Sequence, residues 1–140
     1  MMNIMLIFAG TMSLIAAALH LGCIYFCASW YRLFGAGEHM ALMAEQGSIK
    51  PTLITLSITL VLMTWSLYAF SAAGAIIKLP FIRVILMLIT AIYIFRGVAG
   101  YFFMNTPLGR TPEFWIWSLS ICLIIGLVHL IGLKQARSTL

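Results

Sequence analysis

Four long runs of apolar residues constrain this chain more than any other feature. Crossing a bilayer core takes about 20 residues of helix, and the runs fall at about residues 3–31, 51–73, 81–104 and 113–133. Only 8% of the 140 residues are charged and 64% are hydrophobic, so one small core cannot shield the apolar surface from water. The sequence therefore predicts an all-α polytopic membrane protein, a bundle of four transmembrane helices forming one domain over residues 1–140.

Prolines mark the start of three of these four predicted spans. Pro51 begins the second run, Pro80 precedes the third, and Pro112 follows a threonine and precedes an acid at the start of the fourth. This order is typical of a helix N-terminus. No Lys or Arg precedes the first run, which continues to Trp30, so we expect a retained span rather than a cleaved signal peptide.

The charged residues predict which side of the membrane each loop faces. The loop after the second span and the C-terminal tail are basic without an acid; they contain Lys78, Arg83, Lys134 and Arg137. The opposite side contains Arg32, Lys50, Arg110 and all three acids, Glu38, Glu45 and Glu113. A basic, acid-free side is typical of the cytoplasm, so we expect both termini there. The basic residues form no stripe, which argues against a nucleic-acid partner.

The loop after the first span, GAGEHMALMAEQGS, holds helix-forming residues between glycines. At helical spacing, Glu38, Leu42 and Glu45 share one face. The segment predicts a short interfacial helix in the first outside loop, and a simple connector is the alternative.

Arg96 is the one basic residue deep within a predicted span, in the stretch YIFRGVAGY. It lies roughly 20 Å along its helix from Arg83, where a charge is costly unless it snorkels or finds a partner. We expect a carboxylate partner, Glu45 or Glu38 before Glu113, while snorkelling is the structural alternative. His20 lies at a similar depth and could share one polar pocket with Arg96. The predicted polar centre comprises Arg96, Glu45, Glu38, His20 and Glu113.

The histidines and cysteines do not predict a cofactor. His20, Cys23 and Cys27 share one helix face, as do Cys122 and His129, but no CxxC pair accompanies them and cysteine is often a small packing residue. The depths of His20 and His129 differ by roughly 15 Å, too much for both to ligate one haem iron. We expect no metal and no cofactor.

Small and polar residues recur at helical spacing in every span. They include Ser13, Ala16 and His20 in the first; Thr55, Thr59 and Ser66 in the second; Tyr93, Arg96 and Gly100 in the third; and Cys122, Gly126, His129 and Gly132 in the fourth. Such residues let membrane helices approach closely and bond across the gap. We expect these stripes to meet at the centre of the bundle.

The stretches GAGEHMALMAEQGSIKP, WSLYAFSAAG, LPFIR, IYIFRGVAG, FWIWS and ICLIIGLVHLIGLK cover much of the chain. In this combination the chain resembles small four-helix inner-membrane proteins of Gram-negative bacteria. The resemblance implies a non-enzymatic bundle in the bacterial inner membrane that supports membrane integrity or charge and potential homeostasis. It assigns no site residues.

Two other functions stay open at this point. A small transporter or ion-conducting protein would use Arg96 and His20, although the absence of an acid within the spans argues against carboxylate-driven exchange. An accessory subunit of a larger membrane complex is the third possibility. The expected partners are the lipid bilayer and further copies of the chain in a homo-oligomer.

Overall fold

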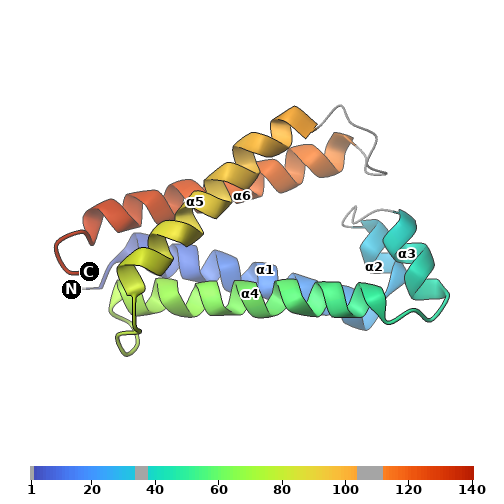
Figure 1. The fold of residues 1–140 in the computed structure, drawn as a ribbon, viewed down its shortest axis with the longest axis horizontal. Coiled ribbons are helices and arrows are strands. Elements are labelled where there is room, and N and C mark those ends of the chain that lie inside the picture. Colours follow the sequence, from blue (N-terminus) through green and yellow to red (C-terminus); the bar gives the residue numbers. More distant parts are fainter. Residues whose placement is uncertain (1, 34–37, 104–111) are drawn as a thin grey trace.

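The computed structural model describes residues 2–33, 38–103 and 112–140, and all regular structure in these ranges is helical (Figure 1). The helices are α1 (Ile4–Phe26), α2 (Ala28–Leu33), α3 (Glu38–Glu45), α4 (Lys50–Ala73), α5 (Ile82–Phe103) and α6 (Pro112–Gln135).

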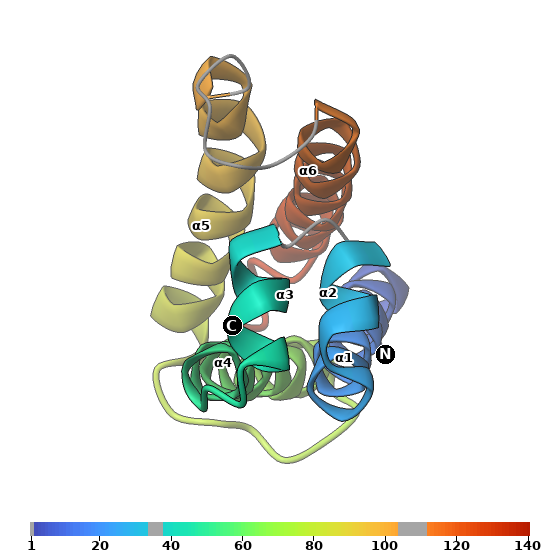
Figure 2. The ribbon, with the colours of Figure 1, turned by 90° about the vertical axis from the view of Figure 1, so that its right-hand side faces the viewer.

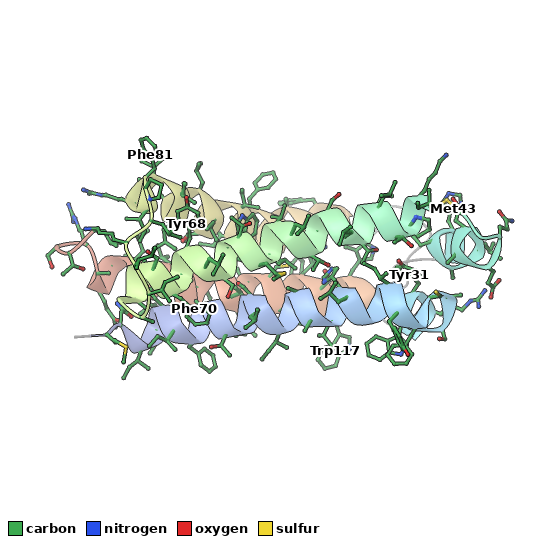
Figure 3. All side chains as sticks on the ribbon, turned by 90° about the horizontal axis from the view of Figure 1, so that it is seen from below. Tyr31, Met43, Tyr68, Phe70, Phe81 and Trp117 are labelled. Carbon is green, nitrogen blue, oxygen red and sulfur yellow. The ribbon has the colours of Figure 1, made fainter. Side chains whose placement is uncertain are left out.

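Four of these helices, α1, α4, α5 and α6, are long and apolar enough to cross a membrane. They correspond to the four predicted spans, although α1 ends before the first predicted span does. Their outer surfaces carry large apolar side chains, such as Phe95 (73% exposed), Phe102 (81%) and Trp117 (71%). Figure 3 shows Phe81 and Trp117 projecting away from the helices. An exterior of this kind needs a hydrocarbon solvent, which supports the prediction of a multi-pass membrane protein.

The long helices form two antiparallel pairs. α1 packs most extensively on α4, and α5 on α6, while α1–α6 and α4–α5 contacts are lighter. The pairs lie close together at the end that holds both termini and diverge toward the end that holds α2 and α3 (Figure 1). Figure 2, viewed from that second end, shows α5 and α6 above α4 and α1.

Hydrogen bonds tie three helices together at the end that holds the termini. Asn3 donates its backbone N–H to the carbonyl of Ala73 at 3.0 Å and its side-chain amide to the carbonyl of Gly132 at 3.1 Å. Its side-chain oxygen also caps α1 by accepting from the N–H of Leu6 at 3.1 Å. The start of α1 is therefore anchored to the ends of α4 and α6, and both termini lie at one end of the bundle (Figure 1). That this end is cytoplasmic stays a prediction.

The first predicted span is not one helix to residue 31, and that part of the prediction is wrong. α1 ends at Phe26, and Cys27 adopts φ 56°, ψ −134°, which cannot continue a right-handed helix. The chain then redirects into α2. Trp30 stacks on Phe26 with ring centroids 4.5 Å apart and covers Gly22, where an added Cβ would lie 2.5 Å from the Trp30 ring. Aromatic packing thus favours the redirected course.

The short helix predicted in the first outside loop is present as α3, which replaces the alternative of a simple connector. Ala41 on its inner face is fully buried and belongs to a small cluster with Cys23 and Tyr31. α3 packs against α2 and α4. Its position relative to a membrane interface stays a prediction.

Close approach of backbones defines the α5–α6 seam. A Cβ added at Gly97 would lie 2.9 Å from the Cβ and 3.1 Å from the Cα of Leu123, and one at Gly126 would lie 3.0 Å from the backbone N of Ile94. The obstacle in both cases is partly backbone, which cannot rotate away. The structure thus brings Tyr93 of the third predicted stripe against Gly126 of the fourth, as expected. Arg96 of the third stripe does not follow the expectation, because its side chain is exposed.

Replacing Gly97 with leucine should therefore separate α5 from α6. We expect Gly97→Leu to cost about 1–3 kcal/mol of stability and to lower the melting temperature in detergent by at least about 3 °C. Ala91→Leu, which adds the same side chain at an exposed position of α5, is the matched control. Equal melting temperatures for the two variants would contradict the close seam.

Candidate functional site

Three buried polar side chains from three helices meet inside the bundle. Ser13 of α1 and Tyr93 of α5 share a hydrogen bond of 2.9 Å between their hydroxyl oxygens. The Tyr93 ring lies against the imidazole of His129 on α6, with centroids 5.3 Å apart. All three are at least 96% buried. Ser13, Tyr93 and His129 are called the central cluster below.

The central cluster also receives a side chain from α4. The Trp65 ring meets Tyr93 edge to face, with centroids 5.0 Å apart. This geometry is favourable for aromatic pairs because the positive edge of one ring faces the negative face of the other. Tyr93 is therefore the residue at which all four long helices meet.

His129 has an incompletely satisfied imidazole. Its Nδ1 lies 2.9 Å from the carbonyl of Ile125, one turn earlier, so this nitrogen carries the hydrogen and donates. Its Nε2 is buried without a hydrogen-bond partner among the described residues. An unpaired lone pair costs less than an unpaired charge, so the neutral ring suits this apolar position.

The side chains of the central cluster link helices to one another. Nucleophilic catalysis needs a hydroxyl or thiol within hydrogen-bond reach of a base that a third group orients. The described bond of Ser13 goes to Tyr93 rather than to the histidine, and the imidazole hydrogen goes to its own helix. The arrangement fits packing and hydrogen bonding across helices.

Two further hydrogen bonds cross between helices along α4. Ser66 donates to the carbonyl of Gly10 on α1 at 2.7 Å, and Tyr31 of α2 shares a 3.1 Å hydroxyl contact with Thr55. Both lie on buried faces. The polar stripe predicted on the second span thus faces α1 and α2, as expected for a stripe at the bundle interior.

Arg96 lies on an exposed part of α5 and donates through Nη2 to the hydroxyl of Ser118 on α6, at 3.1 Å. This contact links α5 to α6. An exposed arginine can carry its charge toward the interface along its own apolar stem. The position therefore agrees with the snorkelling alternative.

The structure gives Glu45 a different partner from the one predicted. Its carboxylate accepts from Nη1 of Arg32 at 2.5 Å, and both side chains are about half exposed. The break at Cys27 explains this, because it directs α2 toward α3 and brings Arg32 over the loop helix. The side chains of Glu38 and Glu113 lie outside the described residues, so their predicted pairing with Arg96 stays a prediction.

His20 does not join Arg96 in the described contacts. It is half-buried on α1, and its Nδ1 lies 2.7 Å from the carbonyl of Ala16 on the same helix. Arg96 is on the α5–α6 pair and His20 on the α1–α4 pair, and these pairs diverge toward the α2–α3 end (Figure 1). The described residues of the predicted polar centre are therefore held by three separate sets of contacts.

The cysteines are free thiols in different surroundings: Cys23 is buried, Cys122 half-buried and Cys27 exposed. Within residues 2–33, 38–103 and 112–140, no group of three or more His, Cys, Asp or Glu side chains gathers where it could hold a metal ion. Metal binding thus receives no geometric support from the described part of the chain.

The sequence predicts Ser13, Tyr93 and His129 on inward-facing stripes but does not identify them as a cluster. Helical spacing is the signal in the sequence that indicates these residues. It shows that each residue faces inward, whereas their meeting depends on the relative heights of three helices, which spacing along one helix does not specify.

Comparisons of the chain with protein-family models, with curated proteins and with solved structures found no match. The resemblance to small four-helix inner-membrane proteins therefore stays a prediction.

Removing the Tyr93 hydroxyl should weaken the bundle without changing its packing. Tyr93→Phe keeps the contacts with Trp65 and His129 but loses the bond to Ser13, and we expect a loss of about 1 kcal/mol in reversible unfolding in mixed micelles. Tyr101→Phe, at a 67% exposed position of the same helix, is the control.

A double-mutant cycle with Ser13→Ala isolates the bond itself. The double variant should lose less stability than the sum of the two single variants, because either single change already breaks the bond. Strict additivity would show that the two hydroxyls do not interact.

Proposed function

We propose that this chain is a non-enzymatic helical bundle of the bacterial inner membrane that supports membrane integrity or the balance of charge across the membrane. The proposal rests on one observation: polar side chains in the interior form hydrogen bonds between helices. Ser13, Tyr93 and Ser66 hold helices to one another, and the Ser13 hydroxyl bonds to Tyr93 rather than to the base His129.

The distribution of charge supports the same proposal. Apart from Arg96, the described cations lie at the two ends of the bundle, and Glu45 is paired at the α2–α3 end. A pathway for ions usually needs polar or charged side chains lining a continuous route through the bundle. A hollow of about 550 Å³ lies at the opposite end beside Asn3 and Gln135, and neither Arg96 nor His20 lines it.

A small transporter is the second candidate, and one observation favours it. The unpartnered Nε2 of His129 lies fully buried where the four helices meet, and a histidine at such a depth can carry a proton. This route would differ from the one predicted, because it runs through the central cluster rather than through Arg96 and His20.

Ion flux separates these two functions. Purified protein in liposomes should leave proton leak under a valinomycin-imposed potential within about twofold of that of protein-free liposomes, read with an internal pH dye. Potassium leak, read with a potassium electrode in the absence of valinomycin, should stay within the same limit. Flux that rises with protein content and disappears in His129→Ala or His20→Ala would overturn the proposal in favour of transport.

Deletion in cells that encode the chain tests the other half of the proposal. We expect a weaker signal from a potential-sensitive dye and greater sensitivity to detergents, both restored by wild-type protein and by His20→Ala. Unchanged potential and unchanged detergent sensitivity would contradict a supporting role in the envelope, and capture of a stoichiometric membrane partner by crosslinking would favour an accessory subunit.

A further inference from the structure

Three cations surround a hollow at the end of the bundle that holds the termini. The hollow measures about 220 Å³ and is lined by Arg83, Met87, Leu133, Lys134, Arg137 and Leu140. These residues come from the first turns of α5, the last turn of α6 and the segment that follows it. They are called the basic pocket below.

The cations of the basic pocket are not neutralised within the described ranges. No Asp or Glu side chain there forms an ion pair with Arg83, Lys134 or Arg137, and the side chains of these three residues make no hydrogen bond. By contrast, Lys78 at the same end donates to the carbonyl of Thr139 at 3.3 Å. Three positive charges around one hollow repel one another, and an anion would relieve that repulsion.

The lining of the basic pocket combines charged and apolar side chains. Arg83 is the second residue of α5 and Lys134 the second-last of α6, so both lie at the end of a spanning helix, where lipid headgroups are found. Met87 lies one turn further into α5, and Leu133 continues the wall on α6. A ligand that fits has an anionic head and an apolar continuation.

The neighbouring hollow provides a contrast at the same end. It is larger, at about 550 Å³, and its lining comprises Met2, Asn3, Ile4, Met5, Ala72, Gln135, Ala136 and Thr139. This lining carries amide and hydroxyl groups but no charged side chain. The gathering of cations is therefore particular to the basic pocket rather than common to every hollow at this end.

We propose that the basic pocket binds the phosphate headgroup of an anionic phospholipid, with Arg83, Lys134 and Arg137 contacting the phosphate and Met87 and Leu133 contacting the start of an acyl chain. Arginine suits phosphate because its planar fork donates two hydrogen bonds at once, and basic pockets between membrane helices are known to hold such headgroups. The inference depends on the membrane location and is independent of the proposed function.

Native mass spectrometry of the full chain in nonionic detergent tests this site. Titration with phosphatidylglycerol should load one lipid per chain at least about tenfold more tightly than phosphatidylethanolamine. The variant Arg83→Gln/Lys134→Gln/Arg137→Gln should lose about twentyfold in phosphatidylglycerol affinity, which removes the preference. Arg83→Lys/Arg137→Lys, which keeps all charges, should stay within about threefold of wild type.

Lys78→Gln is the matched control, because it removes a cation from the same end without touching the basic pocket. If Lys78→Gln lost as much phosphatidylglycerol affinity as the triple variant, the binding would depend on the general positive charge of this end. That result would contradict a specific site in the basic pocket. Equal binding of the two lipids to wild-type protein would overturn it as well.

A ligand without an acyl chain distinguishes a lipid phosphate from a soluble phosphate. We expect sn-glycerol 3-phosphate at millimolar concentration to leave bound phosphatidylglycerol in place, because it lacks the chain that contacts Met87 and Leu133. Complete displacement would identify a site for a soluble phosphate instead and contradict a lipid ligand. Unchanged helical circular dichroism in the triple variant establishes that lost binding is not lost folding.

Discussion

In a hydrocarbon solvent the hydrophobic effect does not drive apolar helix surfaces together, because lipid chains are as apolar as the helices. The rest of this structure depends on that constraint. Helix association then relies on close packing and on hydrogen bonds between helices. The α5–α6 seam shows the first, because Gly97 and Gly126 let backbones approach to a distance that a Cβ would prevent. The central cluster shows the second, because Ser13 and Tyr93 bond between α1 and α5.

The same constraint explains how charge is distributed. Charged groups concentrate at the ends, where water and headgroups are available, and Arg32 with Glu45 joins α2 to α3 at one of them. Arg96 is the exception, and its exposed position beside Ser118 lets the guanidinium reach toward the interface. An exposed charge costs less than a sealed one, since it can draw headgroups and water to itself.

Composition predicted the four spans because 20 apolar residues in lipid have few alternatives to a helix. The break at Cys27 was not predictable in the same way, because no glycine, proline or cap residue marks it. It arises from the packing of Trp30 on Gly22 and Phe26, which is tertiary. The missed break also made the predicted partner of Glu45 wrong, because that partner depends on where α2 points. Inward-facing stripes were readable from spacing, whereas the meeting of Tyr93 with His129 depends on the relative heights of two helices.

The central claim is that this chain crosses the membrane four times with its basic, terminal end in the cytoplasm. Single cysteines at Lys78 and at Lys50, in a chain whose three native cysteines are replaced, test it directly in intact cells with a membrane-impermeant thiol reagent. The account predicts labelling at position 50 and protection at position 78 until the membrane is permeabilised, because the loops before α4 and after it lie at opposite ends of the bundle. Labelling at 78 with protection at 50 would reverse the orientation, and equal labelling at both positions would contradict a membrane-spanning α4.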